Sequence, residues 1–262
     1  MNMTPLSFRQ QEIITQARAQ GRVSVEDLAE RFDVTPQTIR KDLNDLCDMH
    51  LLSRVHGGAM IASGVENLGY AARRQVASAE KRAIGEAAAK LIPNNSSLFL
   101  NLGTTTEEVA RALTGHEGLL VITNNLNIAT LLYPHPKIEV IMAGGPVRRT
   151  DGGVIGGAAV DFIKQFKVDY ALVGASAIDD EGALLDYDFR EVRVSQAIIG
   201  NSRKVILVSD SSKFERSAPI RVAHMSQVHV FVTDWLSSES VSQICRAEGV
   251  EVIETGGPPA AP

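Results

Sequence analysis

The feature that most restricts the fold of this 262-residue chain is a series of seven short apolar runs in its last two thirds. The runs are rich in Val, Ile and Leu, and most are continuous rather than alternating, which is typical of strands buried on both faces of a sheet. Helical segments separate them, and this alternation predicts an α/β domain with an open, mainly parallel sheet. The seven runs cover residues 97–102, 119–123, 138–143, 169–175, 204–210, 229–234 and 250–254.

Changes in composition along the chain predict its domain boundaries. Residues 1–60 form short charged segments of helical pattern, whereas residues 61–79 are mostly small and follow no clear period. We therefore predict four parts: a helical domain over 1–60, a linker over 61–79, the α/β domain over 80–254 and a disordered tail over 255–262. The helices expected in the α/β domain cover 80–91, 105–113, 126–133, 160–166, 192–201 and 238–248.

The N-terminal domain is predicted to contain three short helices and a hairpin. Ser24 is a plausible N-cap for the second helix, because its hydroxyl can accept a free backbone N–H and Asp27 follows three residues later. Thr35 is the expected N-cap of the third helix, with Pro36 at the first helical position. A hairpin over 51–59 follows, closed by two glycines.

The third helix has two chemically different faces. Ile39, Leu43 and Leu46 share one face and predict packing on the first two helices. The opposite face offers cations, which suit phosphates and guanine edges, and amides, which suit adenine edges. A helix, a tight turn and a helix with a polar outer face favour a helix-turn-helix, in which the second helix enters the major groove. That face carries Gln37, Arg40, Lys41 and Asn44, and the hairpin adds Arg54 and His56.

The net charge neither supports nor excludes a DNA-binding helix-turn-helix. The chain has 26 Lys and Arg against 31 Asp and Glu, which excludes a protein that binds nucleic acid with its whole surface. Residues 1–60 are close to neutral, with seven basic and eight acidic residues. A small helical bundle with a merely solvated face, or one that binds another protein, is therefore the alternative at this point.

Small and polar residues follow successive predicted strands of the α/β domain. In open α/β sheets ligands bind beyond the carboxyl ends of the strands, and the start of a helix favours an anion. We therefore predict a site for a small anion. The alternatives are ordinary N-caps, turns, a solvated loop at the two arginines and a surface ion pair. The residues are Gly103, Thr104, Thr105, Thr106, Asn124, Asn125, Gly144, Gly145, Arg148, Arg149, Ser176, Asp210 and Lys213.

Catalysis has little support in these residues. The chain shows no Gly-x-Ser-x-Gly elbow and no Cys/His pair, so a nucleophile is not indicated. Asp210 and Lys213 are the only attractive acid–base pair for an isomerase. The acidic segment with Asp179, Asp180, Glu181, Asp186 and Asp188 is interpreted as solvated turns.

Metal, disulfide and membrane sites are not expected. The two cysteines, Cys47 and Cys245, lie far apart and the histidines are scattered. No apolar run approaches the roughly 20 residues of a membrane span, and the N-terminus has no apolar signal-peptide core. We expect a cytoplasmic protein without metal or cofactor.

The segment Val23–Ala59 resembles the N-terminal domain of the DeoR family of bacterial transcriptional regulators. TPQTIRKDL, followed closely by RVHGGA, carries the resemblance. It implies a winged helix-turn-helix, with the motif over 24–43 and the recognition helix over 35–44. The DNA-binding residues it predicts are Ser24, Thr35, Pro36, Gln37, Thr38, Arg40, Lys41, Asn44, Arg54, His56, Gly57 and Gly58.

The resemblance continues from residue 80 to about 233. EKRAIGEAA, NLGTTTEEVA, VITNNLNIA, MAGG, GASAID and SDSSKF are similar to the DeoR-family effector domain, which is similar in fold to ribose-5-phosphate isomerase and binds phosphorylated metabolites without turnover. The strand-end residues above, except Arg149, are thus expected to bind an effector. Residues 149–218 resemble family members that respond to glycerol 3-phosphate. Pro146 departs from the family pattern, which has an acidic residue there, and this leaves the roles of Arg148 and Arg149 open.

These observations predict a metabolite-responsive transcriptional repressor. Its expected partners are a double-stranded DNA operator and a small phosphorylated metabolite, and we expect a homodimer or homotetramer on paired half-sites. The alternative is a sugar-phosphate isomerase-like enzyme with an appended DNA-binding domain.

Overall fold

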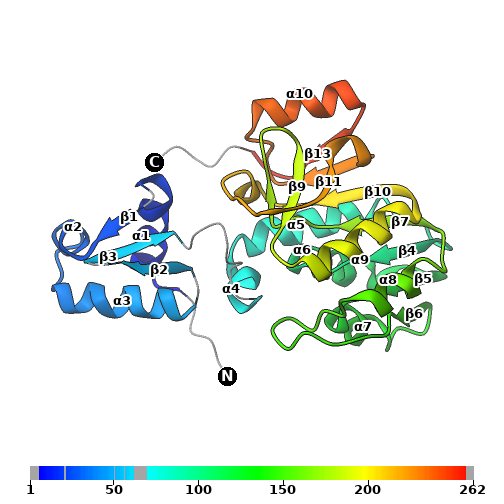
Figure 1. Cartoon of the computed structure of the whole chain (residues 1–262), viewed down its shortest axis with the longest axis horizontal. Helices are drawn as coiled ribbons and strands as arrows, with labels where there is room; N and C mark the ends of the chain where they lie inside the picture. Colours follow the sequence, from blue (N-terminus) through cyan, green and yellow to red (C-terminus); the bar gives the residue numbers. More distant parts are fainter. Residues whose placement is uncertain (1–5, 21, 50, 56, 62–69, 258–262) are drawn as a thin grey trace. The chain divides into compact units, whose positions relative to one another are not determined.

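The computed structural model describes residues 6–20, 22–49, 51–55, 57–61 and 70–257. The chain divides into two compact units, residues 1–76 and 77–262 (Figure 1). Most of the predicted disordered tail lies outside the described residues. Its first part is hydrogen-bonded, because the Thr255 and Gly256 amides donate to the carbonyls of Thr233 and Asp234 at 2.9 Å.

The N-terminal unit contains the three predicted helices and a three-stranded antiparallel sheet in the order β1-β3-β2. Both predicted caps are confirmed: the Ser24 hydroxyl accepts the Asp27 amide at 3.0 Å, and the Thr35 hydroxyl accepts the Thr38 amide at 3.2 Å. Strand β1 was not predicted, because three residues are too short for a pattern. The elements are α1 (Phe8–Gln20), β1 (Arg22–Ser24), α2 (Val25–Arg31), α3 (Pro36–Asp48), β2 (Leu52–Val55), β3 (Gly58–Ile61) and α4 (Tyr70–Gln75).

Two glycines turn the chain between β2 and β3. Gly57 has φ +76°, a left-handed conformation that favours glycine. Gly58 pairs with Ser24 of β1, and a Cβ atom at position 58 would lie 2.0 Å from the carbonyl oxygen of Val23. The absence of a side chain at Gly58 is therefore required by the packing of β3 on β1, whatever the hairpin does with DNA.

The two glycines are expected to differ in their response to a methyl group. We expect Gly57→Ala to cost about 1 kcal/mol of stability, because only its backbone conformation is disfavoured. Apart from its chain neighbours, no described residue would have an atom within 4 Å of the added Cβ. Gly58→Ala should cost about 3 kcal/mol, because backbone must move to admit the Cβ. Urea unfolding followed by far-ultraviolet circular dichroism measures both, and equal losses would contradict this account.

The C-terminal unit is built on a seven-stranded sheet in the order β13-β12-β10-β7-β4-β5-β6, in which all neighbouring strands are parallel. All seven predicted strands are present, and the predicted α/β fold is confirmed. The strands are β4 (Ser97–Leu100), β5 (Leu119–Thr123), β6 (Ile138–Met142), β7 (Val168–Val173), β10 (Ser202–Val208), β12 (Val230–Thr233) and β13 (Glu251–Glu254).

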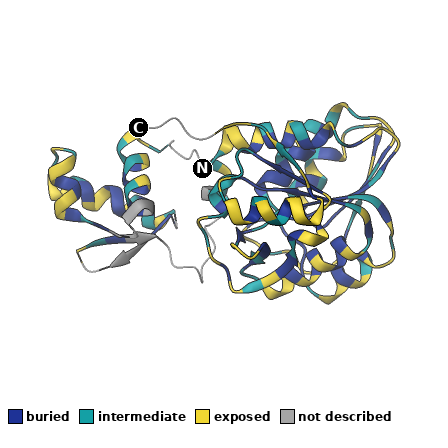
Figure 2. Ribbon diagram, turned by 90° about the horizontal axis from the view of Figure 1, so that it is seen from above, coloured by how far each residue is buried: buried dark blue, intermediate teal, exposed yellow. Residues whose placement is uncertain are grey.

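Helices cover both faces of this sheet. Neighbouring residues of one strand enter different cores: Leu98 belongs to the core that contains Ile84 of α5, whereas Phe99 belongs to the core that contains Ile198 of α9. Helices α5, α6 and α7 cover one face and α8, α9 and α10 the other, and the strands between them are buried (Figure 2). The helices are α5 (Ser78–Ala89), α6 (Thr104–Ala112), α7 (Leu126–Leu132), α8 (Gly157–Ile163), α9 (Phe189–Gly200) and α10 (Glu239–Glu248).

A second, antiparallel sheet of three strands in the order β11-β9-β8 was not predicted. It comprises β8 (Ala177–Ile178), β9 (Ala183–Asp186) and β11 (Ile220–His224). The interpretation of the acidic segment as solvated turns is wrong for Asp186, which is buried at the end of β9. Acidic and glycine residues interrupt this region, so it lacks the apolar runs that mark strands.

In the parts of the chain that the structure describes, no helix has the length and apolar character needed to cross a membrane.

Candidate DNA-binding and effector sites

Helix α3 presents a polar face outside the core of the N-terminal unit. Ile39, Leu43 and Leu46 are buried against α1 and α2, which confirms the predicted periodicity. Arg9 of α1 holds the buried Asp42 of α3, with its Nε donating to Oδ2 at 2.5 Å. This ion pair fixes the rotation of α3 about its axis. The opposite face is exposed and carries Gln37, Arg40, Lys41 and Asn44.

The other predicted DNA-binding residues differ in their surroundings. Ser24, Thr35 and Thr38 have hydroxyls engaged in the helix caps, and the Thr35 and Thr38 oxygens lie 2.9 Å apart. Pro36 is exposed at the start of α3. Arg54 lies in β2, and His56 falls outside the described residues.

Polar side chains gather at the carboxyl edge of the parallel sheet. Strand β4 leads through Asn101 into α6, whose first turn contains the buried Thr104, Thr105 and Thr106. The Thr106 hydroxyl donates to the carbonyl of Asn101 or Gly103, each at 2.8 Å. Within the described residues, no side chain caps the start of α6. Its first backbone N–H groups therefore keep their preference for an anion.

A buried cluster of charges lies at the end of β10. Asp210 is 1 % exposed, Lys213 7 % and Lys81 of α5 2 %. The Lys81 Nζ lies 3.9 Å from Asp210 Oδ2. Burial raises the pKa of Asp210, but Lys213, Lys81, the Ser212 hydroxyl and Arg216 outweigh burial and hold the pKa below its usual range. The surface ion pair considered for Asp210 and Lys213 is therefore wrong, because both groups are buried.

Four buried oxygen atoms at this edge have no hydrogen-bond partner among the described residues. They are Asn101 Oδ1 after β4, Asn124 Oδ1 after β5, and Ser209 Oγ and Asp210 Oδ2 after β10. Buried polar groups without partners are rare in folded proteins and call for an explanation. The edge can accept hydrogen bonds from hydroxyl groups and bind an anion beside its ammonium groups, which fits a hydroxylated anion.

Asn125 has a structural role: it caps α7 and also binds Glu107 of α6. The sequence indicates the cap but not the contact with Glu107. Its Oδ1 caps α7 by accepting the amides of Asn127 at 2.9 Å and Ile128 at 3.4 Å. Its Nδ2 donates to Glu107 of α6 at 3.2 Å. Asn127 also donates to Glu107, at 3.0 Å, and to the Asp151 carbonyl, at 2.9 Å. Among the described residues, the Asn124 side chain makes one hydrogen bond, which its Nδ2 donates to the Val154 carbonyl at 3.2 Å.

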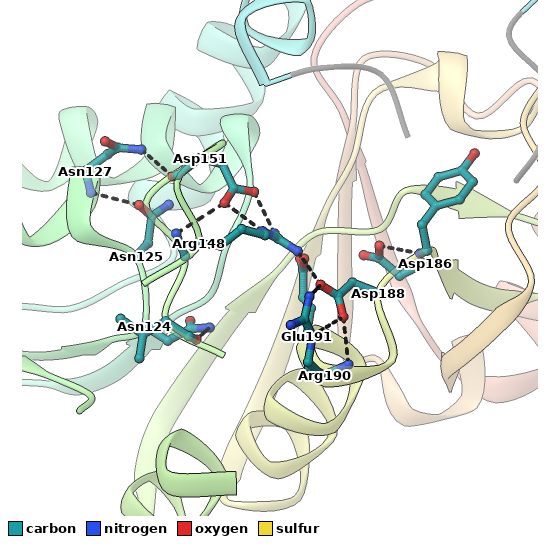
Figure 3. Close-up of polar contacts among 12 residues, drawn as sticks. Asn124, Asn125, Asn127, Arg148, Asp151, Asp186, Asp188, Arg190 and Glu191 are labelled. Carbon is teal, nitrogen blue, oxygen red and sulfur yellow. Dashed lines mark hydrogen bonds and ion pairs between the residues drawn. The ribbon is translucent and has the colours of Figure 1, made fainter. Parts of the chain in front are cut away.

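Arg148 joins the loop after β6 to the start of α9. Its guanidinium contacts Asp151 at 2.6 Å, Asp188 at 2.9 Å and Glu191 at 2.5 Å. Figure 3 shows the Arg148 side chain between Asp151 and the two acidic residues at the start of α9. Burial of Asp188 opposes ionisation, but hydrogen bonds from Arg190 and Arg148 prevail and lower its pKa to about 2. Asp188 is thus an ion-paired N-cap of α9, which corrects its interpretation as a solvated turn.

The remaining predicted effector residues lie along the same edge. Gly144 and Gly145 are exposed after β6, as is Arg149 further along the loop. Ser176 is buried after β7, and its amide donates to the Leu185 carbonyl at 3.0 Å.

Several residues of this edge were not predicted. Lys81 lies in the motif EKRAIGEAA and Asn101 in NLGTTTEEVA. The site was predicted from polar residues between the end of a strand and the start of the next helix, and neither residue was selected on that basis. Asp151 and Glu191 are recognised as part of this edge because the structure places them in contact with Arg148. A lysine in the first turn of an amphipathic helix gave no signal, because such residues are usually solvated.

The N-terminal unit has an exposed polar face on α3, and the α/β unit has a buried, charged sheet edge. These two features together fit a DNA-binding regulator with a sensor domain. The DeoR-like helix-turn-helix domain matches residues 9–65, and the DeoR C terminal sensor domain matches residues 76–235. The chain therefore belongs to the DeoR family.

Full-length relatives support this class. The chain is 49 % identical to the glycerol-3-phosphate regulon repressor of Haemophilus influenzae, over 87 % of this chain and 89 % of the relative. It is 45 % identical to the protein of the same name in Escherichia coli K12, over 93 % and 97 %. Ribose 5-phosphate isomerase A from Methanocaldococcus jannaschii is 15 % identical, covering 53 % of this chain and 55 % of that chain with a TM-score of 0.40. Both of these full-length relatives carry the name of a repressor, and this chain has the helix-turn-helix and sensor domains of the same family.

Proposed function

We propose that this repressor binds its operator through α3 and the β2–β3 hairpin, and that glycerol 3-phosphate bound at the sheet edge of the C-terminal unit controls that binding. The observation that carries the ligand proposal is the buried set of Lys81, Asp210 and Lys213 beside unpartnered oxygen atoms. Ammonium groups suit the phosphate, and the oxygens suit hydroxyl donors. The names of the Haemophilus influenzae and Escherichia coli relatives support glycerol 3-phosphate as the particular metabolite.

The roles of individual residues follow from their surroundings. Base contacts are assigned to the exposed face of α3, while Ser24, Thr35 and Thr38 act mainly by fixing helix starts. Arg54, His56 and the hairpin glycines are assigned to a wing that contacts phosphates or the minor groove. At the sheet edge, Thr104, Thr105 and the start of α6 are assigned to the phosphate, and Asn101, Asn124 and Asp210 to hydroxyl groups.

The domain plan and assembly complete the proposal. Residues 61–79 connect the DNA-binding and sensor domains. The protein acts in the cytoplasm as a homodimer or homotetramer that binds paired half-sites. A ligand changes operator affinity only if it binds two arrangements of the protein unequally.

Removal of the Arg40 guanidinium is expected to weaken operator binding. We expect Arg40→Ala to cost about 1–3 kcal/mol if the side chain contacts a base, with relaxed sequence preference at one position. The probe is a duplex selected by this protein from a random-sequence library, titrated by fluorescence anisotropy. Arg82→Ala, which removes an exposed arginine from α5, is the matched control. Equal affinities for both variants would remove Arg40 as a base contact.

The effector proposal is tested with the same duplex. Glycerol 3-phosphate should raise the melting temperature of the protein and change its affinity for the duplex, whereas glycerol and inorganic phosphate at the same concentration should do less. Stabilisation without any change in duplex affinity would contradict control by this ligand. If glycerol 3-phosphate changes neither the melting temperature nor the duplex affinity while another phosphate ester changes both, that ester and not glycerol 3-phosphate is the effector.

A further inference from the structure

Asn101, the first residue after β4, is held on one side of its side-chain amide and not on the other. Its Nδ2 donates to Ser195 Oγ of α9 at 2.7 Å, and its backbone amide donates to the Leu172 carbonyl at 3.1 Å. The side-chain oxygen Oδ1 is buried and has no hydrogen-bond partner among the described residues. Because a buried acceptor without a partner lowers stability, this oxygen calls for a donor that the described part of the chain does not supply.

Ser195 decides which end of the Asn101 amide faces α9. The Ser195 hydroxyl donates to the Glu191 carbonyl at 3.2 Å, one turn earlier in the helix, so its lone pairs are available to an N–H donor. A reversed amide would need that hydroxyl proton for Oδ1 and would leave Nδ2 without this acceptor. Ser195 therefore keeps the nitrogen of Asn101 against α9 and turns the oxygen away from the helix.

Asn124, the first residue after β5, repeats this arrangement on the neighbouring strand. Its Nδ2 donates to the Val154 carbonyl at 3.2 Å, and its Oδ1 is another buried oxygen without a hydrogen-bond partner in the described part of the chain. Leu100 of β4 is paired with Thr123 of β5. Asn101 and Asn124 therefore follow at the same level of two adjacent strands, about 5 Å apart across the sheet.

The two asparagine side chains lie on the same side of the sheet. Phe99 and Ile122, two residues before Asn101 and Asn124, belong to the core that α8 and α9 cover. Side chains two positions apart in a strand point to the same face, so both asparagines share that face. Two acceptor oxygens at this spacing suit two hydroxyl donors on adjacent carbon atoms of one ligand.

We propose that Ser195 is a positioning residue that makes the sensor edge specific for a ligand with vicinal hydroxyl groups. It holds Asn101 Oδ1 in place to accept one hydroxyl of the ligand, while Asn124 Oδ1 accepts the other. This rests on the proposed function, in which the same ligand carries a phosphate. A phosphate ester without hydroxyl groups leaves both buried oxygens unpaired and is therefore bound more weakly.

The helix that carries Ser195 is fixed at its start, so the serine has a defined position. Glu191, one turn before Ser195, contacts Arg148 of the loop after β6 at 2.5 Å, and Asp188 caps the helix by accepting the Arg190 amide at 2.9 Å (Figure 3). A binding group that is held by fixed neighbours loses little entropy when it pairs with a ligand. The fixed start of α9 therefore favours Ser195 as a determinant of specificity.

Specificity is tested on the full-length protein by calorimetric titration with glycerol 3-phosphate and with n-propyl phosphate, which has the same carbon chain and phosphate but no hydroxyl groups. We expect Ser195→Ala to weaken glycerol 3-phosphate binding about tenfold and n-propyl phosphate binding less than about twofold. Ser202→Ala is the matched control and should change neither affinity, because Ser202 is also buried and its hydroxyl donates to the Ile199 carbonyl at 3.1 Å. Displacement of glycerol 3-phosphate measures a ligand that binds too weakly for direct titration.

A second substitution shows whether Ser195 acts through Asn101. Asn101→Ala should also weaken glycerol 3-phosphate binding, and adding Ser195→Ala should weaken it less than about twofold further, because the side chain that the serine holds is already gone. Losses that multiply in the double variant would overturn the positioning role. A cooperative urea transition of Trp235 fluorescence shows that each variant is folded. If Ser195→Ala is not folded, Ser195→Cys replaces it.

The results separate this inference from the proposed function. A wild-type protein that binds neither probe rejects the ligand of the proposed function, and this inference with it. Equal affinities of the wild type for the two probes retain an anion site but overturn the recognition of hydroxyl groups. If the wild type prefers glycerol 3-phosphate and Ser195→Ala keeps the same preference, only the role of Ser195 is rejected.

Discussion

Replacement of Asp210 by Asn is expected to lower the free energy of unfolding of the C-terminal unit by about 3–5 kcal/mol, the range found when one partner of a buried ion pair is removed. Asn keeps the shape of the side chain but leaves Lys81 and Lys213 without their shared carboxylate. The single tryptophan, Trp235, lies in this unit and reports its unfolding in urea by fluorescence. The measurement is made at pH 7, where Asp210 is ionised because its pKa is lowered.

A matched control and a second substitution identify the cause. Asp161→Asn makes the same chemical change at an exposed position of α8 and should alter stability by less than about 0.5 kcal/mol. Lys81→Met combined with Asp210→Asn should be more stable than Asp210→Asn alone, because one of the two ammonium groups is gone. If Asp210→Asn is as stable as wild type, the cluster does not depend on this carboxylate.

Arg148→Met is expected to cost about 3 kcal/mol, the lower end of the range for a broken buried pair, because the arginine side chain is 19 % exposed. The substitution leaves the carboxylates of Asp151, Asp188 and Glu191 gathered without their common cation. Lys at position 148 keeps the charge but not the planar fork that binds several carboxylates at once, so Arg148→Lys should lie between wild type and Arg148→Met. Trp235 fluorescence in urea measures all three proteins.

The effect of Arg148→Met should depend on pH. Because the pKa of Asp188 is lowered to about 2 in the folded protein, this carboxylate stabilises the fold above about pH 4 and loses that effect as the pH falls toward 2. Protonation of the carboxylates also removes their repulsion in the variant. The stability difference between wild type and Arg148→Met should therefore shrink between pH 7 and pH 3. A constant difference would show that the loss comes from packing and not from charge.

The sequence predicted correctly those features that depend on residues close together in the chain. The seven central strands are buried on both faces, so each is a continuous apolar run that can be recognised without its neighbours. The caps at Ser24 and Thr35 were predicted for the same reason, because a hydroxyl binds an amide only three residues away. The antiparallel sheet was missed, since β8 and β9 are short and separated by acidic residues.

The sequence by itself determined the α/β fold, the two faces of α3 and most of the polar residues at the strand ends. Only the tertiary structure decided which charges meet. Lys81 and Asp210 are 129 positions apart, and Arg148 reaches Glu191 across 43. Strand and helix patterns come from interactions over a few residues, whereas a buried ion pair depends on strand order and helix packing, which bring distant residues into contact. The chemistry of the sensor edge is therefore a property of the fold.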